Sequence, residues 1–97
     1  MKSREEIIQT LKDNTTELRN RYRVHRIALF GSYARGDQRE DSDVDILVDF
    51  DPSIGLGFVS LAEELERLLG VSVELVSSRA ISPRMKKAIE EDLIEVA

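Results

Sequence analysis

The sequence has no cysteine and a single histidine, His25, among its 97 residues. These absences exclude disulfide bonds, a cysteine nucleophile and cysteine-ligated zinc, and they leave a histidine-based zinc site short of ligands. Charged residues make up 34% of the chain and recur throughout it, so no stretch approaches the roughly 20 apolar residues that cross a bilayer. The charged start, Met1–Glu6, lacks the apolar core of a secretion signal, so we expect a cytoplasmic protein.

Tryptophan is also absent, and aromatic residues make up only 5% of the chain. The net charge is −5, and residues 27–97 alone carry −8 while residues 1–26 carry +3. A chain that is acidic and poor in aromatic rings has neither the electrostatic surface nor the stacking platform that nucleic-acid binding needs. Direct nucleic-acid binding is therefore the least favoured function.

The length and the 41% content of hydrophobic residues predict one domain, residues 1–97, with a modest core. Seven acidic residues fall between Asp37 and Asp51 against the single basic Arg39. Such a run is either a solvated acidic turn or a site whose repulsion is relieved by a divalent cation.

The order of elements predicts an α/β fold in which helices flank a small mixed β-sheet. A capping box at Ser3–Glu6 begins a helix that we expect to continue to about residue 22. A glycine-bent turn leads to a short helix, and Ser82-Pro83 opens a last helix whose predicted buried face is Ile81, Met85, Ala88 and Ile89. The remaining predicted elements are strands at 24–30, 44–50 and 71–76, a helix at 58–69 ending at Gly70, and a short edge strand at 93–96.

Two aspartates on the second predicted strand, Asp43 and Asp45, are the first candidate functional residues. Alternate strand residues lie about 6.6 Å apart and point the same way, so both carboxylates can converge on a hard cation. Mg²⁺ is the natural candidate, because it accepts one or two carboxylates and completes its shell with water and phosphate oxygens. Glu74, on the third predicted strand, could supply a third ligand or accept a proton from the acceptor.

The turn Gly31-Ser32 follows a buried strand and could hold phosphate, since glycine allows close approach of the backbone and serine adds a hydroxyl donor. The surrounding residues fit neither the dinucleotide-binding glycine motif nor the P-loop. Arg35 could pair with phosphate oxygens or instead hold the acidic loop by a salt bridge, and the sequence leaves both open. Ser32 is not expected to be an acylating nucleophile, because no nucleophile elbow surrounds it.

The segment Gly31–Phe50, GSYARGDQREDSDVDILVDF, closely resembles the signature of the DNA polymerase beta nucleotidyltransferase superfamily, in its minimal (MNT) branch. The matching residues are Gly31, Ser32, Ala34, Arg35, Gly36, Ser42, Asp43 and Asp45. Glu74 falls where the family usually carries aspartate. The resemblance implies Mg²⁺ held by Asp43, Asp45 and Glu74 as catalytic residues, with Gly31, Ser32, Arg35 and Ser42 binding the nucleotide. The implied reaction moves a nucleoside monophosphate from a triphosphate to an acceptor hydroxyl.

MNT proteins are commonly the antitoxin of a pair with a HEPN ribonuclease toxin, so the resemblance suggests transfer of AMP from ATP to a toxin tyrosine. Two alternatives stay open: a module that neutralises the toxin by contact alone, and a transferase for a small molecule such as an aminoglycoside. The sequence leaves open the acceptor, the base preference and whether the chain forms a homo-oligomer. It also leaves open whether the basic cluster, Arg79, Arg84, Lys86 and Lys87, contacts a triphosphate or an acidic partner or is simply solvated.

Overall fold

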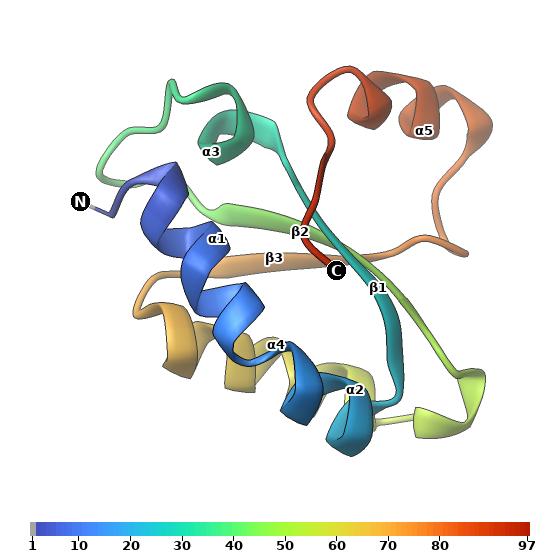
Figure 1. The fold of residues 1–97 in the computed structure, drawn as a ribbon. Helices are drawn as coiled ribbons and strands as arrows, with labels where there is room; N and C mark the ends of the chain where they lie inside the picture. The colour runs from blue at the N-terminus through green and yellow to red at the C-terminus, as the bar shows by residue number, and fades with distance from the viewer. Residues whose placement is uncertain (1) are drawn as a thin grey trace.

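The computed structural model describes residues 2–97, in which four strands form one mixed sheet with the order β3-β2-β1-β4 (Figure 1). β1 pairs antiparallel with both β2 and β4, whereas β2 pairs parallel with β3. This is the predicted small mixed sheet. The strands are β1 (Val24–Phe30), β2 (Val44–Phe50), β3 (Val73–Ser77) and β4 (Ile94–Glu95).

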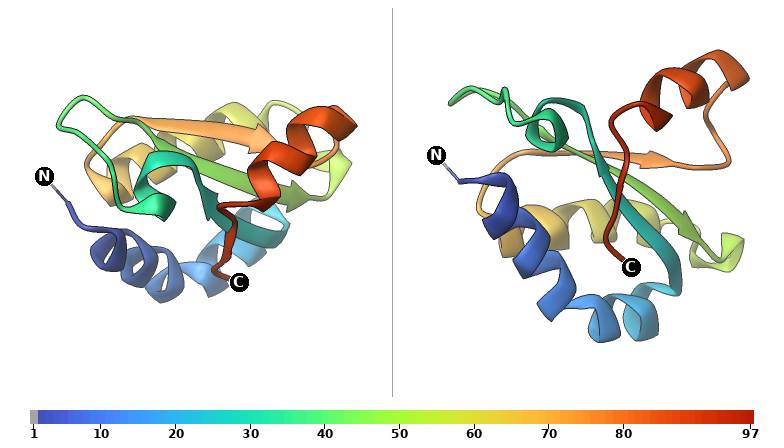
Figure 2. Two further views of the ribbon diagram at one scale, coloured as in Figure 1. Left: turned by 90° about the horizontal axis from the view of Figure 1, so that it is seen from above. Right: turned by 45° about the horizontal axis from the view of Figure 1, so that its top comes forward.

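Helices cover the two faces of the sheet unequally (Figures 1 and 2). α1 (Arg4–Asp13), α2 (Thr15–Tyr22) and α4 (Gly57–Leu69) lie together on one face, and α5 (Pro83–Glu90) lies alone on the other. α3 (Gly31–Arg35) leaves the end of β1, and a short 3₁₀ helix, η1 (Pro52–Ile54), follows β2. Within residues 2–97, none of the helices has the length and apolar character needed to cross a membrane.

The main core lies between the sheet and the three helices α1, α2 and α4. Apolar side chains of α1, α2 and α4 pack there on one face of β2, which presents Val44, Ile46 and Val48. The opposite face of the sheet carries a much smaller buried cluster, made of Ala28, Leu47 and Ile89. The alternation predicted for residues 44–50 is therefore confirmed, and it turns Asp45 and Asp49 toward the sparsely covered face.

The first predicted helix is in fact two helices, because the helix is interrupted at Asn14. The Asn14 amide donates to the Thr10 carbonyl oxygen, and the Thr15 hydroxyl donates to the Leu11 carbonyl oxygen. Such side chains compete for backbone partners and interrupt a helix. The start of α1 is as predicted: the Ser3 hydroxyl accepts from the Glu6 N–H, and the Glu6 carboxylate accepts from the Ser3 N–H.

The predicted buried face of the last helix is wrong in part. Ser82 and Pro83 do open α5, and Ile89 is buried. Met85, however, is 45% exposed, and Ala88 is exposed too. Ile81, just before the helix, is half-buried and packs against the same cluster as Ile89. The physical reason for the exposure of Met85 and Ala88 is that α5 packs on the sheet without a second helix beside it.

The third predicted strand is also shifted, since β3 runs from Val73 to Ser77 rather than from 71 to 76. Gly70 ends α4 with a left-handed backbone, as predicted, and the chain needs the next two residues to enter the sheet. The alternation of faces is nevertheless as expected, with Val71, Val73 and Leu75 against the main core and Val76 on the other side.

Candidate active site

Asp45 is the second residue of β2, an inner strand of the sheet, and lies between two neighbouring strands. It is paired with Phe30, the last residue of β1, on one side and with Glu74 of β3 on the other. Because Asp45 and Glu74 are directly paired in the register of β2 and β3, their side chains leave the sheet on the same face. The strand register therefore brings together two of the three carboxylates predicted from the sequence.

Gly31 lies directly against the Asp45 carboxylate. Its φ is 74°, and a Cβ atom at this position would lie 2.1 Å from Asp45 Oδ2 and 3.0 Å from its Cγ. No side chain fits in that space, and the left-handed backbone independently favours glycine. The sequence predicted a close backbone approach at this turn, and the structure shows such an approach toward a carboxylate.

The short helix that follows the turn is anchored from the N-terminal segment. Tyr33 and Ala34 are buried, and Arg4 of α1 donates from Nη1 to the Ala34 carbonyl oxygen at 3.0 Å. A guanidinium at the end of a helix satisfies a carbonyl that has no partner within the helix. α3, which carries Ser32 and Arg35, is therefore held firmly beside Asp45.

The electrostatics of the pair are unfavourable for two negative charges. Burial, which is the largest cause, acts together with the adjacent carboxyl of Glu74 and the charge of Asp43 to raise the pKa of Asp45 to about 6, while Arg35 opposes them. Two carboxyl groups that share one site favour retaining a proton unless a cation compensates for the charge. Asp45 therefore carries a charge that is costly to maintain, at a place where a cation would be stabilised.

Asp43 is the remaining predicted ligand. The structure places it in the loop immediately before β2, with an exposed side chain. The negative charge of Asp43 contributes to the raised pKa of Asp45. Across residues 2–97, no three side chains among histidine, aspartate and glutamate are gathered closely enough to hold a metal ion. The sheet thus assembles Asp45 and Glu74, and the convergence of Asp43 on them is not achieved in this arrangement.

A cleft of about 350 Å³ opens beside Asp45 on the α5 side of the sheet, and neither Glu74 nor Asp43 is among its lining residues. Gly31, Ser32, Arg35 and Asp45 contribute one side of it, and Met85 and Ala88 contribute exposed apolar surface from α5. Three of the four predicted nucleotide-binding residues therefore line the same cleft as Asp45. Its remaining lining residues are Phe30, Ile89 and Asp92.

Arg35 makes two ion pairs, one with Asp92, which lines the cleft, and one with Asp37 of the acidic loop. Its Nε lies 3.1 Å from Asp37 Oδ2 and its Nη1 lies 2.8 Å from Asp92 Oδ2. Hydrogen bonds to Asp92 and Asp37 raise the pKa of the guanidinium above its ordinary value. The structure thus contains the salt bridge to the acidic loop that the sequence allowed. The pair with Asp92 was not predicted, since nothing in the sequence indicates that residues 57 positions apart meet.

Ser42, the fourth predicted nucleotide-binding residue, is engaged in the turn before β2. Its hydroxyl accepts from the Arg39 N–H at 2.8 Å, and its own N–H donates to the Arg39 carbonyl oxygen at 3.0 Å. It is absent from the lining of the cleft. In this structure Ser42 shapes the loop that delivers Asp43.

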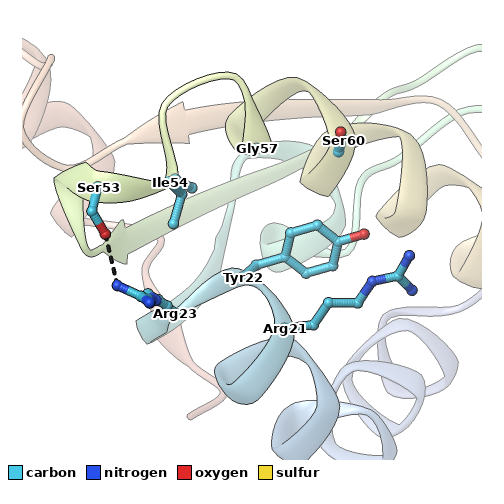
Figure 3. Close-up of a pocket in the computed structure, with 7 residues that line it drawn as sticks. All are labelled: Arg21, Tyr22, Arg23, Ser53, Ile54, Gly57 and Ser60. Atoms are coloured by element: carbon cyan, nitrogen blue, oxygen red, sulfur yellow. Dashed lines mark hydrogen bonds between the residues drawn. The ribbon is translucent and has the colours of Figure 1, made fainter.

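A larger cavity lies elsewhere, between α2, η1 and the start of α4 (Figure 3). It measures about 530 Å³, and Arg23 donates to the Ser53 hydroxyl at its edge. Its residues adjoin the beginning of β1, whereas Asp45 lies at the end of β1. We assign the site to the smaller cleft because Asp45, the Gly31-Ser32 turn and Arg35 line it together.

The basic cluster predicted near α5 does not contribute to the lining of the cleft. Arg79 lies 3.7 Å from Asp49 of β2, and Lys86 borders a separate cavity of about 250 Å³ behind α5. Arg84 and Lys87 are exposed on α5. Contact between this cluster and a triphosphate in the cleft receives no support from these positions.

The chain belongs to the nucleotidyltransferase domain family, whose family model matches residues 8–96. The protein adenylyltransferase MntA of Thermococcus cleftensis is 46% identical over 94 residues, which cover 95% of this chain and 94% of that protein. The match extends over the carboxylate pair, the glycine turn and α5. The resemblance stated from Gly31–Phe50 is therefore confirmed over nearly the whole chain.

Solved structures show the same fold. A protein assigned as a minimal nucleotidyltransferase superposes with a TM-score of 0.79 at 36% identity, covering 96% of this chain and 95% of that one. A toxin–antitoxin structure with AMP-PNP superposes with a TM-score of 0.70 at 29% identity, covering 97% of this chain and 72% of that one. The chain is a nucleotidyltransferase with the minimal form of the fold.

Proposed function

We propose that the chain is a Mg²⁺-dependent enzyme that transfers AMP from ATP to a hydroxyl of a partner protein, and that it thereby acts as an antitoxin. The partner that we propose is a HEPN toxin, and the acceptor is a tyrosine of that toxin. One observation carries the proposal: Asp45, the register partner of Glu74, lies against Gly31 in a cleft that Ser32 and Arg35 also line. Phosphoryl transfer depends on positioning and on neutralising charge, and this cleft provides groups for both.

The residues present fit a magnesium ion. Asp45 and Glu74 offer hard carboxylate oxygens from adjacent strands, and their mutual repulsion favours a cation beside them. Asp43 is exposed in the preceding loop, so a change of its side-chain rotamer would be the route by which it joins them. When bound, Mg²⁺ would neutralise the developing charge on the triphosphate as pyrophosphate leaves.

The other side chains have separate tasks in the proposed reaction. The Ser32 hydroxyl and the Arg35 guanidinium bind phosphate oxygens, and Gly31 leaves the space for the chain to pass close to Asp45. The acceptor oxygen forms a bond to the α-phosphorus while the bond from that phosphorus to the β-phosphate oxygen breaks. The hydroxyl proton passes to a carboxylate, for which Glu74 is the exposed candidate.

The substrate and the partner are supported by the relatives. The similar protein of Thermococcus cleftensis is named a protein adenylyltransferase, which supports AMP as the group transferred. The AMP-PNP structure is that of a toxin–antitoxin, which supports ATP as donor and a toxin as acceptor. The HEPN class of the partner rests on the resemblance of Gly31–Phe50 to the MNT signature.

The test is label transfer from [α-³²P]ATP to the neighbouring gene product in the presence of Mg²⁺. We expect label on the partner, its loss on mutation of the accepting tyrosine, and its loss in Asp43→Asn, Asp45→Asn and Glu74→Gln. Asp49→Asn is the matched control, because Asp49 shares the strand and face of Asp45 but does not line the cleft. Label transfer that persists in Asp45→Asn would refute the catalytic assignment.

A second candidate is a module that binds the toxin without turnover. The observation that favours it is that the three carboxylates do not meet in a metal-holding group among residues 2–97. This alternative predicts that Asp45→Ala still neutralises the partner in a growth assay and still binds it in a pull-down. The enzymatic function predicts instead that Asp45→Ala binds the partner in the pull-down but does not neutralise it in the growth assay.

A further inference from the structure

Asp92 has no role in the reaction proposed above, although it lines the same cleft as Ser32 and Asp45. It lies in the turn between α5 and β4. Its backbone N–H donates to the carbonyl oxygen of Ile89, the one buried side chain of α5. The Asp92 backbone is therefore fixed to a residue that packs on the sheet.

The carboxylate of Asp92 points at Arg35, with 2.8 Å between Oδ2 and Nη1, and the side chain is only 26% exposed. Asp37, the second partner of Arg35, differs in two ways. Its side chain is 62% exposed, and it belongs to the acidic loop and is not part of the cleft lining. Of the two ion pairs, the one with Asp92 is thus the better shielded and lies within the cleft.

A guanidinium carries five N–H groups in a rigid plane. The two ion pairs use one on Nε and one on Nη1, which leaves three to bind an anion. An arginine that is already ordered loses less conformational freedom when it binds phosphate than a mobile one does. The ion pair therefore keeps Arg35 oriented in the cleft without consuming its capacity to bind phosphate.

We propose that Asp92 is a positioning residue that orients Arg35 for the polyphosphate of the nucleotide. The inference rests on the proposed function, because it assumes that the cleft binds a nucleoside triphosphate. It also assigns a role to the turn after α5, which the ion pair connects to Arg35 at the end of α3. Asp92 itself touches no phosphate.

Two measurements test the assignment, with Asp92→Ala as the variant, Asp37→Ala as the matched control and Asp92→Glu as the conservative replacement. Calorimetric titration with AMP-PNP and Mg²⁺ should give a dissociation constant three- to tenfold higher for Asp92→Ala, the range expected from ordering one long side chain. Asp37→Ala should change it less than twofold, and Asp92→Glu should restore part of the loss. The double variant Arg35→Ala with Asp92→Ala should bind no more weakly than Arg35→Ala alone.

The second measurement needs no nucleotide: the heteronuclear NOE of the Arg35 Nε–Hε group in the free protein. We expect it to fall in Asp92→Ala and to change less in Asp37→Ala. Equal nucleotide affinity in wild type and Asp92→Ala, tighter binding by Asp92→Ala, or an unchanged NOE would overturn the inference. Failure of the wild type to bind AMP-PNP would instead overturn the proposed function, and the inference with it.

Discussion

The substitution Asp45→Asn should stabilise the fold while abolishing nucleotidyl transfer. The pKa of Asp45 is raised from 3.8 to about 6, chiefly by burial and by Glu74. At about 1.36 kcal/mol per pKa unit, this difference corresponds to an upper value of about 3 kcal/mol. Solvent reaches part of the side chain, so screening lowers the expected gain to about 1 to 2 kcal/mol. Asparagine keeps the size of the side chain, and its amide can donate to Glu74.

The pH dependence of the gain follows from the direction of the shift. Between pH 4 and 6 the folded protein holds a proton on Asp45 that the unfolded chain has lost, so the contribution of this group to stability falls as the pH rises. Below pH 4 the group is protonated in both states and contributes nothing. The advantage of Asp45→Asn should therefore be absent at pH 3.5, grow between pH 4 and 6, and be constant above that.

Urea denaturation at a series of pH values, followed by circular dichroism, measures this difference directly. At neutral pH the thermal midpoint of Asp45→Asn should rise by roughly 5 to 15 °C, from the scaling for a domain of this size. Asp49→Asn is the control: it loses only a partly exposed ion pair with Arg79 and should be destabilised by less than about 1 kcal/mol. The reasoning would be refuted if Asp45→Asn were less stable than wild type at pH 7.5. It would also be refuted if the gain in stability over wild type were as large at pH 3.5 as at pH 7.5.

Three further predictions follow from the same geometry. Gly31→Ala should lower the free energy of unfolding by about 3 kcal/mol or more, because the new Cβ would overlap Asp45. Gly36 has the same left-handed backbone but open space around it, so Gly36→Ala should lower the free energy of unfolding by only about 1 kcal/mol. Equal losses of stability in urea denaturation would contradict the close approach of Gly31 to Asp45. Mg²⁺ should raise the thermal midpoint of the wild type and leave that of Asp45→Asn unchanged, and an equal rise in both would place the metal elsewhere. Ser3→Ala should cost about 1 kcal/mol by removing the cap of α1, as measured by denaturation, and no loss would mean that the cap is replaced by water.

Local signals in the sequence were sufficient for most of the elements. The capping box at Ser3, the Ser82-Pro83 helix start and the alternation along residues 44–50 are properties of near neighbours in the chain, and all three are confirmed. The break at Asn14 was missed because apolar residues recur at helical spacing on both sides of it, and this spacing reports burial rather than helix continuity. The shifted start of β3 reflects pairing with β2, which no local pattern encodes.

The site divides in the same way. The sequence by itself determined which residue types are available for phosphate chemistry, namely the Gly31-Ser32 turn, Arg35 and the acidic residues Asp43, Asp45 and Glu74, because motif spacing is a local property. Only the tertiary structure decided which of them meet. Strand register placed Glu74 beside Asp45, and the isolated packing of α5 left Met85 open to the cleft and brought Asp92 to Arg35. Such contacts depend on how distant segments pack, and packing is a property of the whole chain that no short pattern contains.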